Sequence, residues 1–149
     1  MENENQLSLQ LISDHFKKIH DSLLPNPIYG KTIFFCEGCV KPIIERNQLL
    51  GYLGAFSGTS YELNSEIDIV VIPNSSYSNL KNDKSDSVIN LINEKLKNFD
   101  KEKNRYSNKI PNALIVPEHK FFQFIKDHLI NNDQVKIEQF ERINFSYEV

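Results

Sequence analysis

The chain has 149 residues, which is enough for one domain with a real hydrophobic core. Its net charge of −3 argues against a general nucleic-acid binder, because such domains are usually basic. It has no apolar run of the roughly 18–20 residues that a membrane span needs, and residues 1–10 lack the basic start and apolar core of a signal peptide. With two cysteines and no export signal, we expect a cytoplasmic protein without membrane contact.

The N-terminal half predicts two helices and two strands. Apolar residues at spacings of three and four predict an amphipathic helix over residues 6–23, which the linker "LPNPIYG" ends. The run "KTIFF" predicts a buried strand over residues 31–35. A second helix is predicted from Pro42 to Leu53, since proline suits the first helical turn. Residues 55–63 then predict a weak second strand.

The C-terminal half continues with alternating strands and helices. The β-branched run "EIDIVVIPN" predicts the strongest strand. A polar loop is expected over residues 75–86, with Asp83 or Ser85 as the N-cap of the next helix. The later elements are a helix over 88–99, a charged connection over 100–109, a strand over 112–117, a helix over 118–129 and an alternating C-terminal strand over 143–149.

Without its two ends, the predicted order is β-α-β-β-α-β-α. Strand–helix–strand units imply parallel pairing with helices on both faces of the sheet. We therefore expect a small three-layer α/β domain, with a central and mainly parallel four-stranded sheet. The domain is assigned to residues 30–130, with an N-terminal helix and linker in 1–29 and a C-terminal extension in 131–149.

Cys36 and Cys39 form a Cys-x-x-Cys motif directly after the first strand. A structural zinc site needs four ligands. His15 and His20 are five residues apart on one helix, so their rings point about 140° apart and do not converge. The other two histidines, nine residues apart, face opposite ways. A pair of histidines from two different elements stays open, but nothing in the spacing supports it, and we expect no metal. No other cofactor is expected either.

Two further interpretations of the motif remain. In thioredoxin-like proteins the motif follows a strand and opens a helix, whose N-terminus lowers the pKa of the first thiol. The stretch "FFCEGCVKP" is similar to these proteins in the position of its two cysteines. Glu37 lies between the two thiols and opposes that effect. Alternatively, Gly38 permits a tight turn and the cysteines are small, partly buried fillers.

Residues 30–129 resemble a BRCT domain, a phosphopeptide- and DNA-end-binding module of replication and repair proteins. The stretch "GKTIFFCEG" is similar to that family's opening strand, and "LLGYLGAFSGTSYELNSEIDIVVIP" to the end of its first helix and the following strand pair. "NALIVPEHKFFQFI" is similar to its last strand and final helix. The likeness is greatest to divergent bacterial forms attached to DNA ligases and proofreading-type exonucleases.

The resemblance implies a candidate phosphate or partner site made of Glu37, Gly38, Lys84 and, as a substitute, Lys81. In phosphate-binding members a hydroxyl side chain stands where this chain has Glu37. The resemblance brings Glu37 and Lys84 together as an exposed ion pair, which would neutralise the site and weaken phosphate binding.

The leading hypothesis is therefore a non-enzymatic BRCT-like module that docks a protein partner or a DNA end or nick in replication or repair. A thiol oxidoreductase using Cys36 and Cys39 is the second hypothesis. The third is a structural protein that dimerises through its terminal helix and C-terminal strand. Asp68, inside the strongest strand, is interpreted as an edge or cap residue rather than a catalytic acid.

Overall fold

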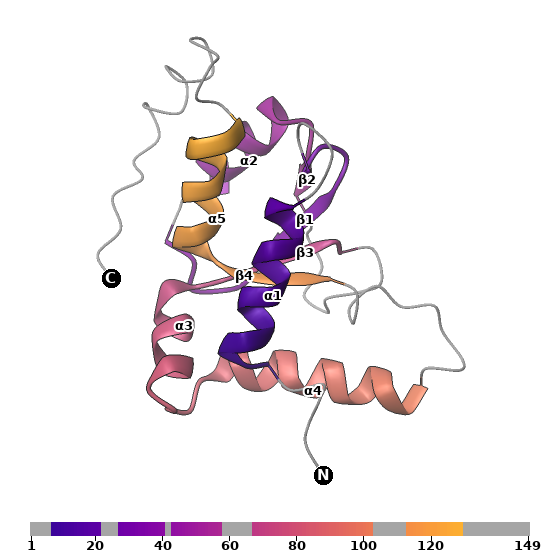
Figure 1. Cartoon of the computed structure of the whole chain (residues 1–149), viewed down its shortest axis with the longest axis vertical. Coiled ribbons are helices and arrows are strands. Elements are labelled where there is room, and N and C mark those ends of the chain that lie inside the picture. The colour runs from indigo at the N-terminus through magenta and orange to yellow at the C-terminus, as the bar shows by residue number, and fades with distance from the viewer. Residues whose placement is uncertain (1–6, 22–26, 41–42, 58–66, 103–112, 130–149) are drawn as a thin grey trace.

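The computed structural model describes residues 7–21, 27–40, 43–57, 67–102 and 113–129 (Figure 1). All the strands are short, and helices connect or flank them. In chain order the elements are α1 Leu9–His20, β1 Thr32–Phe35, α2 Ile43–Tyr52, β2 Phe56–Ser57, β3 Ile69–Ile72, α3 Asn74–Lys81, α4 Ser87–Glu102, β4 Leu114–Pro117 and α5 Glu118–Phe124, which continues as a π-helical turn over Ile125–Leu129.

The four strands form one parallel sheet in the order β2-β1-β3-β4. Pairing of β1 with β3 sets Phe34 opposite Val70, and pairing of β3 with β4 sets Val71 opposite Val116. The predicted α/β class, the four-stranded parallel sheet and the additional N-terminal helix are therefore confirmed. Because all strands run the same way, their carboxyl ends lie at one edge of the molecule.

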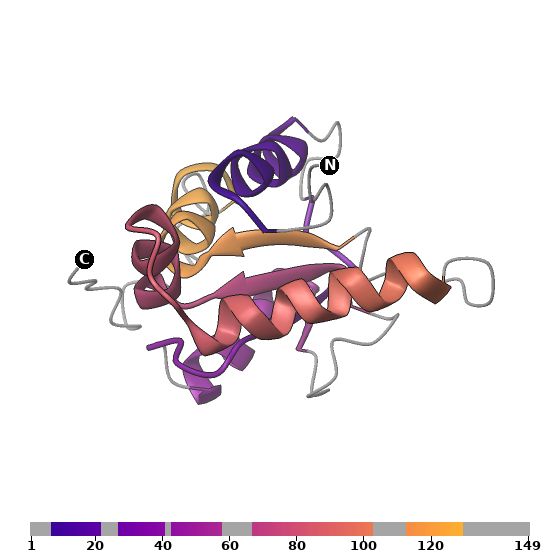
Figure 2. The same ribbon diagram turned by 90° about the horizontal axis from the view of Figure 1, so that it is seen from below.

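Helices cover both faces of the sheet, as successive strand residues point to opposite sides. On one face, strand residues pack with α2 and α5; this cluster includes Ile33, Ile69, Val71, Val116, Leu50, Leu53, Phe121 and Phe122. On the other face, strand residues pack with α4; this cluster includes Val70, Ile72, Ile115, Ile89 and Ile92. Figure 2 shows α4 crossing one face of the sheet.

Helix α1 lies along the free edge of β4 (Figure 2). Its first turn is capped by Ser8, whose side chain accepts a hydrogen bond from the N–H of Leu11. Ile12 belongs to the cluster beneath α4, and Ile19 to the cluster beneath α2 and α5. The N-terminal helix is thus part of the common core.

Residues 75–86 were predicted to be a polar loop, and this prediction is wrong. Helix α3 begins directly after Pro73 and runs through most of that segment. Tyr77 and Leu80, three residues apart, pack against the cluster beneath α4. The N-cap of α4 is also corrected: the carboxylate of Asp86, and not Asp83 or Ser85, accepts hydrogen bonds at the start of that helix.

Other predictions fall on parts of the chain outside the described residues. These are the C-terminal strand over 143–149 and most of the second strand, of which β2 is the described part. Within the described ranges, no helix has the length and apolar character needed to cross a membrane.

Candidate functional site

The Cys-x-x-Cys segment is a tight turn at the end of β1. The N–H of Cys39 donates to the carbonyl of Cys36 at 3.3 Å, and Gly38 between them has a φ of +103°. A glycine meets that requirement without steric cost. Residues 36–40 form this turn and an irregular segment and are not helical, so the thiols do not open a helix. The thioredoxin-like placement expected as an alternative is therefore not formed.

Both thiols are held in the protonated form. Cys36 is 6% exposed, and burial, with a contribution from the Asp86 carboxylate, raises its pKa to about 12. Burial also raises the pKa of Cys39, and the carboxylate of Glu118 adds to this effect. The Cys39 thiol donates to the carbonyl of Val71 at 3.6 Å. Both cysteines are free, Cys36 buried and Cys39 partly buried, which is the burial that the filler interpretation predicts.

The two cysteines also pack on opposite sides of the sheet. Cys36 belongs to the cluster beneath α4, whereas Cys39 packs against the cluster beneath α2 and α5. Among the residues that the structure describes, no three His, Cys, Asp or Glu side chains come together in a way that would hold a metal ion.

The four residues of the expected phosphate site are not brought together. Glu37 and Gly38 are exposed, and a Cβ on Gly38 would lie 3.1 Å from Cγ of Pro73, at the start of α3. Lys84 follows the other end of α3, where its N–H donates to the carbonyl of Asn79 at 2.7 Å. Eight residues of helix rise about 12 Å. The helix missed by the sequence prediction therefore carries Lys84 away from Gly38.

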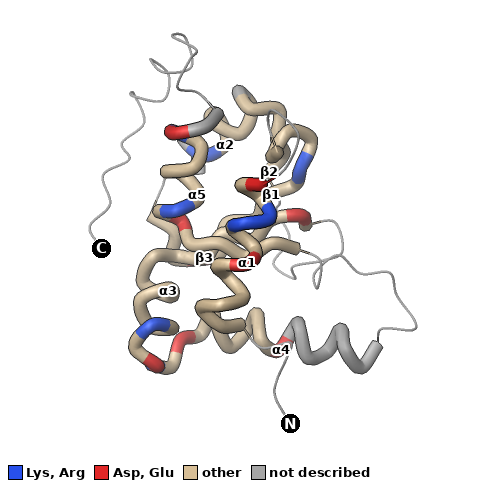
Figure 3. Tube along the Cα trace, viewed as in Figure 1, with Lys and Arg blue, Asp and Glu red and all other residues tan. Residues whose placement is uncertain are grey.

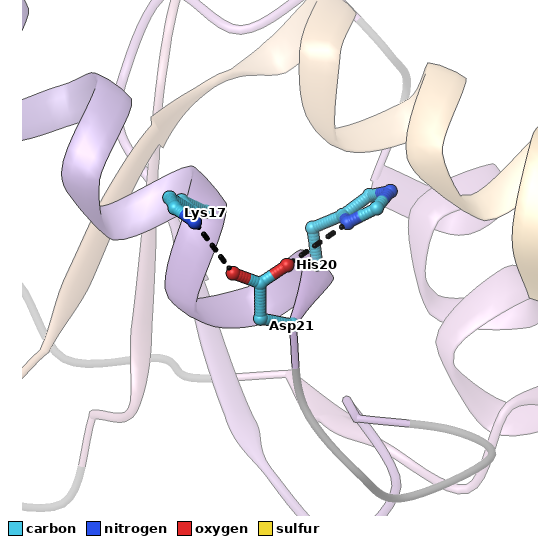
Figure 4. Close-up of polar contacts among 3 residues, drawn as sticks. All are labelled: Lys17, His20 and Asp21. Carbon is cyan, nitrogen blue, oxygen red and sulfur yellow. Dashed lines mark hydrogen bonds and ion pairs between the residues drawn. The ribbon is translucent and has the colours of Figure 1, made fainter.

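The expected Glu37–Lys84 ion pair is accordingly absent from the described part of the chain. The ion pair found there is at the end of α1, where the carboxylate of Asp21 lies 3.0 Å from Nζ of Lys17; Nδ1 of His20 lies 3.4 Å from the same carboxylate (Figure 4). These exposed contacts contribute little to folding stability. They join residues of the last turn of α1 to its C-cap, Asp21, and do not involve Glu37 or Lys84.

A different group of side chains gathers along α3 and the first turn of α5, the two helices that follow β3 and β4. We call Asn74, Tyr77, Lys81, His119 and Lys120 the Tyr77 cluster. The Nζ of Lys81 lies 5.3 Å from the centroid of the Tyr77 ring, and the Nζ of Lys120 lies 5.2 Å from it. The His119 ring centroid is 5.5 Å from the same point. Two cations and an imidazole thus surround one aromatic ring.

Asn74 fixes the position of His119 within this cluster. Its Oδ1 accepts hydrogen bonds from the backbone N–H of His119 at 2.9 Å and from the ring Nδ1 at 2.6 Å. Since an amide oxygen only accepts, Nδ1 carries the proton. Burial lowers the pKa of His119, and the positive charges of Lys120 and Lys81 lower it further. The cluster is thus an electropositive site in which further positive charge is disfavoured.

The sequence alone predicts only part of this cluster. Lys81 was among the candidate residues, and its spacing of four from Tyr77 places both on one side of a helix. The polar residues around this pair predict a loop, in which such a spacing would bring no side chains together. The pairing of β3 with β4 sets Ile72 opposite Pro117, and so places the helices that follow these strands next to each other. This tertiary contact brings Lys120 and His119 to Tyr77.

Two further carboxylates have structural roles. Glu118 is fully buried in the first turn of α5, and its Oε1 accepts a hydrogen bond from the N–H of Val40 at 3.0 Å. Oδ2 of Asp68 accepts one from the N–H of Thr32 at 2.9 Å, which ties the start of β1 to β3. The interpretation of Asp68 as an edge or cap residue is consistent with this contact.

Comparison with known proteins adds no assignment, since no family model, no curated protein and no solved structure matches the chain.

Proposed function

We propose that this chain is a non-enzymatic, BRCT-like interaction module that acts in the cytoplasm and docks a protein partner or a DNA structure during replication or repair. The observation that carries the proposal is the Tyr77 cluster, a partly exposed group of cationic and aromatic side chains beside the carboxyl ends of parallel strands. Ligands of open α/β sheets bind outside the carboxyl ends of the strands.

The order of elements supports the same proposal. The strands and helices follow the β-α-β-β-α-β-α order that the sequence resemblance implies, with α3 as one additional helix between β3 and α4. The part of that resemblance that concerns Glu37, Gly38 and Lys84 finds no support, because these residues are separated along α3. A docking surface in this chain is therefore better sought at the Tyr77 cluster.

The oxidoreductase alternative is disfavoured by the state of the thiols. Disulfide exchange requires an accessible thiolate. Cys36 is buried with its pKa raised to about 12, and burial also raises the pKa of Cys39. Because they pack against opposite faces of the sheet, forming a disulfide between them would disturb one of the two apolar clusters.

Dimerisation through the terminal helix is disfavoured as well. The apolar side of α5 is already covered within the chain, and its residues with at most 5% exposure are Phe121, Phe122, Phe124 and Ile125. A second copy would therefore find no apolar surface on this side of α5. The proposed C-terminal strand of that interface lies outside the described residues.

The proposal can be tested by binding measurements on the purified chain. We would measure fluorescence anisotropy with nicked, blunt-ended and 5′-phosphorylated DNA, and with arrays of phosphorylated and unphosphorylated peptides. Saturable binding to any of these, together with no turnover in an insulin-reduction assay, is the expected result. Turnover of disulfides that depends on Cys36, or no binding to any probe, would overturn it.

A further inference from the structure

We propose that the Tyr77 cluster is a binding site for one compact anionic group, a phosphoryl or a carboxylate, carried by a peptide segment of the partner. This inference rests on the proposed function and identifies the surface and the ligand chemistry of that docking. It also differs from the site that the sequence resemblance implies, since it uses neither Glu37 nor Lys84.

The geometry provides two separate positive charges around one aromatic ring. Lys81 comes from the last turn of α3, and Lys120 from the first turn of α5. Their Nζ atoms lie 5.3 and 5.2 Å from the centroid of the Tyr77 ring, so they are no further apart than the sum of these distances. An anion held between them would interact with both ammonium groups and would relieve their mutual repulsion.

The cluster is built on rigid supports. Asn74 holds His119 through two hydrogen bonds, and both residues stand in the first turns of helices that leave buried strands. Helix α3 is itself fixed at Ser76 and Asn79, which donate to the carboxylate of Asp86 at 3.0 and 2.8 Å. A site assembled on such elements is largely ordered before the ligand arrives, which reduces the entropic cost of binding.

The surroundings favour a compact anion over a long polyanion. Asp83 follows Lys81 by two residues, and Asp86 contacts α3, so acidic and basic residues alternate at the end of this helix (Figure 3). Glu37 is exposed in the turn beside Pro73. The whole chain carries a net charge of −3. A nucleic-acid strand would bring several phosphates close to these carboxylates, whereas a peptide can place one anionic side chain at the lysines and neutral or basic residues beside the acids. Charge complementarity therefore selects a peptide.

The test is an NMR titration of the ¹⁵N-labelled full chain with two minimal probes, N-acetyl-phosphoserine amide and N-acetyl-glutamate amide. Comparison of the two probes distinguishes a phosphoryl from a carboxylate ligand. We expect amide shifts centred on Asn74, Tyr77, His119 and Lys120 with at least one probe. The pKa of His119 is expected to rise by about half a unit or more at saturation, because a nearby anion stabilises the imidazolium.

Variants separate this site from general charge effects. Lys81→Ala and Lys120→Ala should each weaken binding by about fivefold or more, while arginine at either position should keep most of the affinity. Lys31→Ala is the matched control: it removes the same charge beside the amino end of β1, away from the carboxyl ends of the strands, and should change the affinity by less than about twofold.

Several outcomes would overturn the inference. Shifts centred elsewhere, or equal affinities of Lys81→Ala, Lys120→Ala and wild type, would show that the site is wrong while the proposed function stands. A 12-nucleotide single strand that binds through Lys81 and Lys120 more tightly than both probes would assign the cluster to nucleic acid instead. Absence of any binding, here and in the DNA and peptide-array assays, would overturn both the inference and the proposed function.

Discussion

Nδ1 of His15 in α1 accepts a hydrogen bond from the backbone N–H of Ile115 in β4, with the two nitrogens 2.9 Å apart. β4 is an edge strand, and exposed edge donors invite pairing with other chains. The next N–H on the same side would belong to the residue two positions on, which is Pro117 and has none. His15 and Pro117 together protect this edge of the sheet.

This contact predicts that the protein is destabilised by mild acid. Burial, with a contribution from the positive charge of Lys18, lowers the pKa of His15 from 6.5 to about 4. The unfolded chain therefore binds a proton at higher pH than the folded chain, so stability falls as the pH falls from 6.5 towards 4. His15 alone should lower the free energy of unfolding by about 2 kcal/mol between pH 7 and pH 5.

Urea unfolding of two variants checks the cause. His15→Asn keeps an acceptor but does not titrate, so its stability should depend less on pH than that of wild type in this range. His15→Leu removes the acceptor, and at pH 7 it should be less stable by about 1–3 kcal/mol because the Ile115 N–H loses its partner. An unchanged pH dependence in His15→Asn would contradict this role for His15.

Both cysteines should be unreactive in the folded protein. A rise in the Cys36 pKa from 9.0 to about 12 lowers the thiolate population at neutral pH by about a thousandfold. Alkylation by iodoacetamide, followed by mass spectrometry of each cysteine, should be slow in buffer and fast in guanidinium chloride. Rapid native labelling of Cys36 with an apparent pKa near 6–7 would restore the oxidoreductase hypothesis.

Asp86 should be essential for the position of α3 as well as for the start of α4. Its carboxylate accepts hydrogen bonds from the N–H groups of Val88 and Ile89 and from the side chains of Ser76 and Asn79. Partial burial alone would raise its pKa, but these four hydrogen bonds outweigh that effect and lower it. The stabilisation is present above the ordinary carboxyl pKa and is lost as the pH falls through the lowered value.

Two replacements distinguish the roles of Asp86. Asp86→Ala should lower the free energy of unfolding by about 1–3 kcal/mol, since it loses both the cap and the contacts to α3. Asp86→Ser keeps a capping oxygen but does not reach both α3 donors, so it should recover only part of that loss. Denaturant unfolding of the three proteins at pH 7 measures the difference, and equal stability of Asp86→Ala and wild type would contradict the role.

Gly54 should tolerate no side chain. It has a φ of +73°, and a Cβ there would lie 2.5 Å from the ring of Tyr29. Gly54→Ala should therefore lower the free energy of unfolding by about 1–2 kcal/mol, mainly through backbone strain. The clash of the new Cβ with the Tyr29 ring should contribute less, because Tyr29 is 69% exposed and can move. In a Tyr29→Ala background the clash is absent and only the strain remains, so Gly54→Ala should cost slightly less there than in wild type. Denaturant unfolding of the single and double variants measures this difference.

The sequence predicted most of the fold because buried strands and amphipathic helices repeat with simple periods. The run from Ile69 to Ile72 is fully buried, and Val88, Ile89 and Ile92 of α4 pack together against the sheet, so both elements are visible without tertiary information. Helix α3 was missed because its sequence, "NSSYSNLK", is rich in serine and asparagine, which locally favour turns. Its contacts with Asp86 appear only in the folded chain.

The candidate site was harder to predict for the same reason. If residues 75–86 were a loop, as the sequence predicts, Lys84 could lie near Gly38. Because α3 occupies most of this segment, the two residues lie at opposite ends of a helix. Lys81 and Lys120 come to the same aromatic ring because of where α3 and α5 leave the sheet. The spacing of residues along the sequence does not predict this arrangement. Single residues with one dominant local role, such as Gly38 in its turn, were predicted correctly.

The last prediction tests whether the phosphate site implied by the sequence resemblance exists in this chain. The resemblance alone predicts that Glu37→Thr restores a hydroxyl beside Gly38 and Lys84 and raises the affinity for a phosphoserine peptide. Because α3 carries Lys84 away, we expect the gain of Glu37→Thr to match that of Glu37→Gln within about twofold, since both only remove a negative charge.

Calorimetry with one phosphoserine peptide on wild type, Glu37→Thr, Glu37→Gln and Glu37→Thr/Lys84→Ala makes this comparison. Lys84→Ala should cost little in the Glu37→Thr background, whereas Lys81→Ala should cost about fivefold. If Glu37→Thr binds about tenfold more tightly than Glu37→Gln and Lys84→Ala removes that gain, the hydroxyl and Lys84 act together. The phosphate would then bind at the turn after β1, and the Tyr77 cluster would have a structural role only.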